Sequence, residues 1–177
     1  MKVVTMNICD IKLIQPSIIK DPRGFFYENY HKEKLEKQGL HIQIKQENMS
    51  RSSQGTLRGL HYQFAPYEQA KWVHVTHGHI FDVAVDIRPE SSTYGQWVGV
   101  HLSDENRQVL VIPEGFAHGF YVLSPTADVV YKCSELYHPE SEGAIRWNDP
   151  TLNIQWPLLD GPVQISDKDR VAGFFHP

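Results

Sequence analysis

The chain has few of the features that mark several large classes of protein. Only two of its 177 residues are cysteines, and Cys9 and Cys133 are too far apart in sequence to suggest a disulfide framework or a zinc site. No stretch approaches the ~20 apolar residues that cross a bilayer, and the N-terminus lacks the apolar region of a signal peptide. The net charge of −4 argues against a nucleic-acid binder held by phosphate contacts. We expect a soluble cytoplasmic protein.

Low-complexity linkers and internal repeats are also missing, and the length suits one domain with a substantial core. One short helix is expected over residues 32–38, ended by Gly39. From residue 40 onward, beginning with the alternating residues 42–44, the pattern is that of β-strands. Along residues 80–87 every second side chain is apolar, so that one face carries Phe81, Val83, Val85 and Ile87. Short strands divided by turn signals predict an all-β sandwich or barrel.

Residues 55–71 (GTLRGLHYQFAPYEQAK) combine several polar side chains in one stretch. Strand alternation divides them between two faces, with Leu57, Gly59 and His61 on one and Arg58, Leu60 and Tyr62 on the other. Proline at 66 interrupts the strand, so His61 and Lys71 come from two neighbouring segments. Histidine is the usual proton-transfer group near neutral pH, and a lysine beside it can stabilise an oxyanion. The residues alone leave open a catalytic pair or an ordinary polar turn.

Residues 113–118 (PEGFAH) have the form P-x-G-x-x-H, which resembles the second motif of the cupin jelly roll. In metal-binding cupins this histidine is a ligand, together with H-x-H and a glutamate from an earlier motif. The corresponding places here hold His61, Gln63 and Gln69. Amides in place of an imidazole and a carboxylate remove two ligands and the charge that divalent metals favour. We therefore expect no metal, and His118 as a hydrogen-bonded histidine of the barrel.

Eight motifs follow one another along the chain: residues 21–28 (DPRGFFYE), 55–63 (GTLRGLHYQ), 69–71 (QAK), 82–88 (DVAVDIR), 112–120 (IPEGFAHGF), 131–132 (YK), 147–150 (WNDP) and 166–169 (SDKD). Together they closely resemble the dTDP-4-dehydrorhamnose 3,5-epimerase family. The resemblance runs in order over nearly the whole chain. It implies a single cupin-like domain over residues 1–177, a jelly-roll β fold with a few short helices.

The resemblance also implies a reaction. The family's substrate is dTDP-4-dehydro-6-deoxy-D-glucose, which is inverted at C3 and C5 to give dTDP-4-dehydro-L-rhamnose. The ketone at C4 acidifies the neighbouring C–H groups, a base removes one proton, and a proton returned to the opposite face inverts the centre. No metal and no redox cofactor takes part.

By the same resemblance four residues carry the chemistry. His61 is the base, and Asp169 is the carboxylate that fixes its tautomer. Lys71 lies near the enolate oxygen, and Tyr131 is the acid across the ring, protonated because a phenol titrates near ~10. Without the resemblance the ordinary readings would be a barrel-filling tyrosine, a solvated tail carboxylate and an exposed strand lysine.

Substrate binding is assigned by the resemblance to Arg23, Phe26, Glu28, Gln46, Asn48, Arg58, His118 and Tyr137. The two arginines suit the diphosphate, and Tyr137 is the aromatic that stacks on thymine. In the family the N-terminal segment reaches a neighbouring subunit's site, which implies a homodimer. Trp72 departs from the usual aliphatic residue after the lysine.

Two alternatives stay open at this point. A relative could invert only C3 or only C5, or act on a related nucleotide-linked keto sugar, because such members share the whole catalytic set. A catalytically silent sugar-binding protein is the other, although it would have no need of an acid and a base together.

Overall fold

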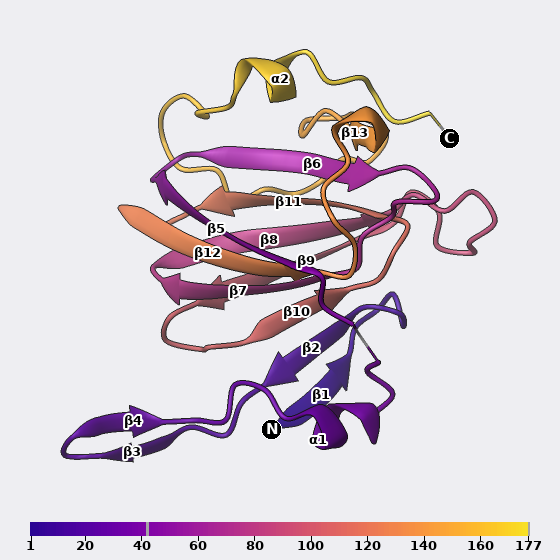
Figure 1. Ribbon diagram of the computed structural model, residues 1–177. Helices are drawn as coiled ribbons and strands as arrows, with labels where there is room; N and C mark the ends of the chain where they lie inside the picture. The colour runs from indigo at the N-terminus through magenta and orange to yellow at the C-terminus, as the bar shows by residue number, and fades with distance from the viewer. Residues whose placement is uncertain (42, 177) are drawn as a thin grey trace.

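The computed structural model describes residues 1–41 and 43–176, which form two large antiparallel β-sheets and a small hairpin (Figure 1). The larger sheet has the order β1 (Lys2–Thr5), β2 (Lys12–Gln15), β10 (Val109–Ile112), β7 (Lys71–His77), β12 (Thr126–Cys133) and β5 (Gln46–Ser53). The five-stranded sheet has the order β13 (Glu142–Ala144), β6 (Leu57–Gln63), β11 (Phe116–Val122), β8 (His79–Asp86) and β9 (Trp97–Ser103). The prediction of an all-β sandwich or barrel is confirmed.

The main core lies between the two large sheets. On β8 the side chains of Ile80 and Ala84 belong to this core, together with Val73 of β7 and Val129 of β12. The alternate residues of β8 point the other way, where they pack with the C-terminal segment in a second cluster that includes Phe81, Val83, Val85, Leu152, Ile154 and Phe175. The two-faced pattern predicted for residues 80–87 is therefore correct, because both faces of this strand are buried.

The helices are few and short, as the sequence indicates. The predicted helix forms as α1 (Lys32–Glu36) and is followed by Gly39, whose φ is +81°. Leu35 anchors it in a cluster with Ile14 and Trp72. The others are α2 (Asp167–Arg170) and the 3-10 turn η1 (Pro139–Ser141). No helix within residues 1–41 and 43–176 is long and apolar enough to cross a membrane.

The strand predicted from residues 42–44 is only partly described. Residue 42 lies outside the described residues, and Ile44 is irregular, so the strand begins instead at Gln46. Ile44 is 38% exposed, which means that its alternation with polar neighbours does not reflect a buried face. This part of the prediction is wrong.

A β-bulge changes the faces of β6. The register pairs His118 with His61 and Phe120 with Arg58. The paired residues are therefore three positions apart on β6 but only two apart on β11. Cross-strand partners share a face, and His118 and Phe120 are two apart on their strand. Arg58 and His61 therefore lie on the same face, and the predicted division between opposite faces is wrong.

Glycine makes the bulge possible. Gly59 has a φ of +122°, and a Cβ there would come 2.5 Å from the Cα of Gly119. Any other residue would meet backbone at this point and would be held in a conformation that L-residues rarely adopt. The bulge is thus a consequence of the two glycines on adjacent strands.

The small hairpin consists of β3 (Ile19–Asp21) and β4 (Gly24–Phe26). It projects from the body of the molecule as an arm, at the lower left of Figure 1. Its apolar side chains are open to solvent, with Ile19 64% and Phe26 68% exposed. Exposed apolar groups gathered on a projecting hairpin are typical of a surface that another molecule covers.

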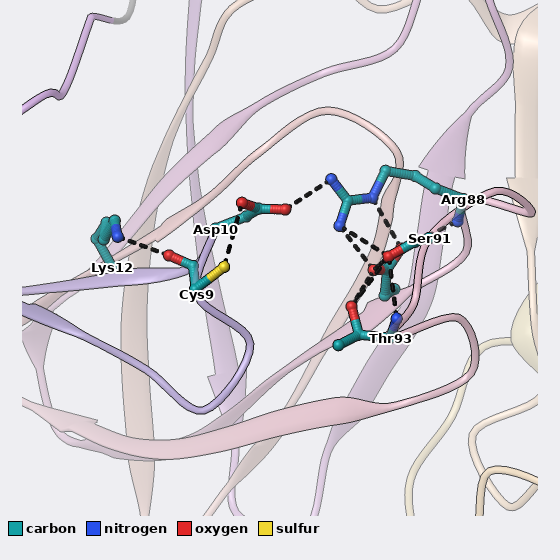
Figure 2. Close-up of polar contacts among 7 residues, drawn as sticks. Cys9, Asp10, Lys12, Arg88, Ser91 and Thr93 are labelled. Atoms are coloured by element: carbon teal, nitrogen blue, oxygen red, sulfur yellow. Dashed lines mark hydrogen bonds and ion pairs between the residues drawn. The ribbon is translucent and has the colours of Figure 1, made fainter.

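A hydrogen-bonded cluster joins the loop after β8 to the turn before β2 (Figure 2). The side chain of Asp86 is fully buried and accepts hydrogen bonds from Arg88, Ser91 and Thr93. Arg88 also reaches Asp10, with 2.9 Å between Nη1 and Oδ2. Burial would raise the pKa of Asp86, but these hydrogen bonds outweigh it and hold that pKa below its ordinary value. The cluster fixes this loop to the turn before β2.

Candidate active site

A cavity of about 300 Å³ opens between the two large sheets. Its walls bring together six residues assigned to the site from the sequence: Gln46, Asn48, His61, Lys71, Tyr131 and Tyr137. Larger hollows, of about 630 and 570 Å³, lie elsewhere and contain none of the four predicted catalytic residues. The predicted chemistry is therefore concentrated in one place, although its members come from strands far apart in sequence.

His61 and Asp169 form a close pair. The distance from His61 Nε2 to Asp169 Oδ1 is 2.5 Å, and the residue Asp169 is only 3% exposed. Asp169 lies on α2, where its backbone N–H donates to the side chain of Ser166, the N-cap residue. Burial would raise the pKa of Asp169, but the bonds to His61 and Ser166 outweigh it and lower the pKa. An ionised carboxylate is thus held against one ring nitrogen, which fixes the imidazole.

Lys71 extends toward His61 from β7 of the six-stranded sheet. It is 8% exposed, and its Nζ lies 3.3 Å from the backbone carbonyl oxygen of His61. Burial lowers the pKa of Lys71, while Cys133, Asp82 and Glu142 offset part of that effect. With one weak acceptor among the described residues, Nζ keeps most of its hydrogen-bonding capacity for a ligand.

Tyr131 and His61 stand on opposite walls of the cavity, because β12 belongs to the six-stranded sheet and β6 to the five-stranded sheet. Burial raises the pKa of the Tyr131 phenol, and Cys133 adds to this, while Arg58 opposes it. The phenol is therefore protonated at neutral pH and able to donate. A ligand between the walls would have a proton acceptor on one side and a proton donor on the other.

Polar groups at the rim surround Tyr137. Its backbone N–H donates to Gln46 Oε1 at 2.8 Å, and Gln46 in turn donates to Asn48 Oδ1 at 2.9 Å. The hydroxyl of Tyr137 donates to Glu142 Oε2 at 2.7 Å, and this carboxylate also pairs with Lys168. Glu142 was missed by the sequence reasoning, since nothing in the run 140–143 (ESEG) signals that it lines a cavity.

Arg58 and His118 lie on the same sheet face as His61 but do not line the cavity itself. Arg58 Nε donates to Ser52 Oγ at 3.0 Å. His118 is 7% exposed and pairs with Asp82, at 2.7 Å from Nε2 to Oδ1. It is thus the hydrogen-bonded barrel histidine that the sequence predicts. Asp82 was also missed, and its second oxygen is buried with no hydrogen-bond partner among the described residues.

Three further predicted binding residues lie still farther from the cavity of their own chain, on the arm or just after it. Arg23 and Phe26 lie on the arm, and Glu28 follows it. Arg23 pairs with Asp21 at 2.6 Å, and Glu28 pairs with Lys34 at 2.9 Å. Their side chains are therefore displayed on the surface rather than gathered around His61.

The residues at the cupin metal positions do not fit a metal. Gln63 and Gln69 turn their amide N–H groups to backbone carbonyls, of Tyr67 and Leu136 for the first and of Glu135 for the second. The two histidines, His61 and His118, each pair with a buried carboxylate. Nor does any group of three or more His, Cys, Asp or Glu residues within 1–41 and 43–176 have an arrangement that could hold a metal ion.

The jelly-roll sheets, the His–Asp pair and the facing tyrosine define a cupin-like protein equipped for proton transfer. Comparison with known proteins gives the family. A model of the dTDP-4-dehydrorhamnose 3,5-epimerase family matches residues 5–176. The enzyme of that name from Escherichia coli (strain K12) is 49% identical over 171 residues, which cover 96% of this chain and 92% of the relative. The chain belongs to the dTDP-4-dehydrorhamnose 3,5-epimerase family.

Solved structures support the fold. A crystal structure of dTDP-6-deoxy-D-glucose-3,5-epimerase from Legionella pneumophila Philadelphia 1, in complex with dTDP-4-keto-L-rhamnose, matches with a TM-score of 0.93 and 51% identity, covering 98% of this chain and 92% of that one. A more distant match is the 3'-monoepimerase ChmJ from Streptomyces bikiniensis, in complex with dTDP-quinovose. Its TM-score is 0.88 and its identity 32%, covering 96% of this chain and 85% of that one. The predicted cupin-type fold and family are confirmed.

Proposed function

We propose that this chain inverts C3 and C5 of dTDP-4-dehydro-6-deoxy-D-glucose to give dTDP-4-dehydro-L-rhamnose. Family membership and the Legionella complex with dTDP-4-keto-L-rhamnose support this substrate class. The observation that carries the proposal is the position of His61 and Tyr131 on opposite sheets with one cavity between them. Inversion at a carbon needs a proton to leave from one face and another to arrive from the opposite face.

His61 acts as the base. The ring nitrogen that is not bound to Asp169 takes the proton from C3 or C5, and the C–H electron pair becomes the double bond of an enolate with its charge on O4. The ionised Asp169 stabilises the imidazolium that results. Lys71, whose one acceptor within residues 1–41 and 43–176 is a backbone carbonyl, donates to O4 and stabilises the enolate.

Tyr131 acts as the acid. Its O–H proton passes to the carbon on the opposite face, and the enolate electrons form the new C–H bond. Solvent then returns a proton to the phenol and removes one from the imidazole. The sugar gains and loses one proton at each centre, so the reaction is neither an oxidation nor a reduction.

The nucleotide lies at the rim, where Tyr137 stacks on thymine and Gln46 and Asn48 supply polar contacts. Arg58 meets the diphosphate from the wall of the barrel. Arg23 and Phe26 on the arm, and Glu28 just after it, reach the site of a second copy, because the arm projects from the body of its own chain (Figure 1) and they do not line its cavity. We therefore infer a homodimer in which each arm completes the partner's site. A single domain over residues 1–177 and a cytoplasmic location stay predictions.

A mono-epimerase is the second candidate. The similarity to ChmJ, a 3'-monoepimerase with a TM-score of 0.88, supports it. In that case the same base and acid would act at one carbon only. A non-catalytic sugar-binding protein is less well supported, since such a protein needs no histidine paired with a buried carboxylate as His61 is with Asp169.

Exchange of substrate hydrogens in heavy water tests the reaction. NMR of the keto sugar should show deuterium entering at both C3 and C5; entry at one carbon indicates a mono-epimerase, and entry at neither indicates binding only. His61→Ala should abolish turnover and exchange, because a placed base contributes ~10²–10⁴-fold. Tyr131→Phe should impair inversion more than exchange. Wild-type exchange rates in His61→Ala would show that the base lies elsewhere.

Mixing two impaired variants tests the shared site, at a substrate concentration far below the raised KM of Arg23→Ala. In a heterodimer of Arg23→Ala and His61→Ala subunits, one site combines an intact His61 with an intact partner arm. Activity per subunit should therefore rise above that of either variant when the two are unfolded together and refolded. If each arm served its own chain, neither site would be intact and the mixture would show only the average activity of its parts.

A further inference from the structure

Gln63 stands at a place where a metal-binding cupin has a ligand, yet it is 6% exposed and takes part in three hydrogen bonds to backbone. We propose that Gln63 is a positioning residue that holds the loop of Tyr137 (residues 134–138) in the conformation that binds the nucleotide. This inference rests on the proposed role of Tyr137 in stacking on thymine. It gives a function to a side chain that the catalytic mechanism does not use.

The contacts of Gln63 surround Tyr137 on both sides in sequence. Its Nε2 donates to the carbonyl oxygen of Leu136 at 3.1 Å, and its Oε1 accepts from the N–H of His138 at 2.7 Å. The same Nε2 donates to the carbonyl oxygen of Tyr67 at 2.5 Å. One buried amide thus binds the residue before Tyr137, the residue after it and the neighbouring loop.

Two further contacts show that this loop is held as a unit. The ring of Tyr67 stacks on that of His138, with 3.7 Å between centroids, so Gln63 bonds to the backbone of both stacked residues. Gln69 donates to the carbonyl oxygen of Glu135 at 2.8 Å. Tyr137 is 49% exposed and faces no other ring among the described residues, and its hydroxyl is bound by Glu142. Its position therefore depends on that one bond and on its backbone.

Glutamine is the side chain that these contacts require. An amide both donates and accepts, whereas a carboxylate only accepts, and a thioether has at most a weak acceptor. The carbonyls of Tyr67 and Leu136 need a donor, and the N–H of His138 needs an acceptor. Without them these backbone groups would turn to water and the loop would move. The nucleotide would then have to order Tyr137 as it binds, which weakens binding.

Calorimetric titration with dTDP alone tests the proposal on four proteins: wild type, Gln63→Met, Tyr137→Ala and the double variant. We expect Gln63→Met to weaken dTDP about 3- to 10-fold, the cost of ordering one side chain on binding. Tyr137→Ala should weaken it about 5- to 100-fold through lost stacking. In the double variant the effect of Gln63→Met should disappear, because no ring is left to position. With substrate, Gln63→Met should raise KM by a larger factor than it lowers kcat.

Gln54→Met is the matched control. Gln54 is an exposed glutamine that also donates to a backbone carbonyl, that of Leu123 at 2.8 Å, but its bond does not involve the Tyr137 loop. It should leave the affinity for dTDP unchanged. Equal weakening by both glutamine variants would overturn the proposal, since any lost side chain–backbone bond would then suffice.

Two other results would overturn it. If the effects of Gln63→Met and Tyr137→Ala simply add in the double variant, Gln63 does not act through Tyr137. If Tyr137→Ala binds dTDP as wild type does, there is no stacking to position. Neither result touches His61 and Tyr131, whose test is solvent exchange into the sugar. Should Gln63→Met fail to fold, Gln63→Glu keeps the acceptor for His138 and loses both donations. Amide exchange in residues 134–138 should then be faster than in wild type, and unchanged exchange would count against the proposal.

Discussion

The pattern Asp-x-Arg occurs twice in this chain and gives nearly the same local structure both times. In Asp21-Pro22-Arg23, the arginine N–H donates to the aspartate Oδ1 at 2.8 Å and its Nη2 lies 2.6 Å from Oδ2. In Asp86-Ile87-Arg88, the corresponding distances are 3.0 and 2.7 Å. Each aspartate ends a strand, β3 in one case and β8 in the other. The spacing alone sets this turn.

The two pairs differ in how far they are exposed and in how many further hydrogen bonds they make. The arm exposes 39% of the Asp21 side chain and 89% of the Arg23 side chain. The Asp86 side chain is fully buried and accepts two further hydrogen bonds, from Ser91 and Thr93, while Arg88 is also bound by Asp10 (Figure 2). One guanidinium has donors to spare and the other has its donors engaged.

This difference separates binding from stability. Arg23 can keep its bond to Asp21 and still offer N–H groups to phosphate oxygens, which suits its proposed role in a partner's site. Arg88 has few N–H groups left for a ligand, but its cluster holds the loop after β8 to the turn before β2. The same motif thus serves a ligand where it is exposed and serves the fold where it is buried.

Asp86→Ala should have the largest effect on stability. It leaves Arg88, Ser91 and Thr93 without their common acceptor, and breaking a buried pair costs about 3–5 kcal/mol. At about 2–4 °C per kcal/mol for a chain of this size, Tm should fall by roughly 10 °C. Urea unfolding measures the loss. The matched variant Asp21→Ala should leave the urea midpoint nearly as in wild type, since surface pairs contribute little; equal losses in the two variants would contradict the comparison.

Arg23→Ala should affect binding instead. Hydrogen bonds to charged groups contribute about 1.5–3 kcal/mol, so KM for the sugar nucleotide should rise about 10- to 100-fold while Tm stays as in wild type. Arg23→Lys should give an intermediate KM, because an ammonium keeps the charge but not the paired donors. A fall in Tm with an unchanged KM would mean that Arg23, like Arg88, serves the fold.

Much of the architecture could be predicted from the sequence. The alternating residues of β8 give both of its faces correctly, because each face is buried against a different layer. The faces of β6 could not be predicted, since the bulge at Gly59 arises from the close approach of Gly119 on another strand. A count of residues along one strand contains no information about such a contact.

The candidate site was predictable only in part, and for a similar reason. His61 and Lys71 stand out in one stretch of sequence, but Asp169 lies 108 residues from the histidine it pairs with. Resemblance to a family suggested that pair, and spacing did not. Glu142 carried no signal at all, because its role depends on a three-residue strand beside β6. Tertiary contacts of this kind are set by the whole fold.

Acid should reduce the difference between Asp86 and Asp21 in what each contributes to stability. The folded-state pKa of Asp86 lies below its ordinary value of 3.8. A depressed pKa contributes stability that is complete above the unfolded value and is lost as pH falls through the folded value. The gap in unfolding free energy between wild type and Asp86→Ala should therefore be constant from pH 7 to 5 and shrink below about pH 4. Urea midpoints at several pH values measure it. A gap that widens in acid would contradict this assignment.

Added salt should give the smallest effect, and it should weaken binding by the exposed arm rather than the stability of the buried Asp86 cluster. The Debye length falls from about 10 Å at 0.1 M to about 3 Å at 1 M salt, and exposed charges are screened far more than buried ones. Added NaCl should therefore raise KM for the sugar nucleotide in wild type, and by a smaller factor in Arg23→Ala, which has already lost the exposed cation. The unfolding free energy lost in Asp86→Ala should change little over the same range, because that carboxylate has no contact with solvent. Steady-state kinetics and urea unfolding at matched salt measure both. If the cost of Asp86→Ala fell with salt as steeply as the binding contribution of Arg23, the two Asp-x-Arg pairs would be equally accessible to ions, and burial would not be what distinguishes them.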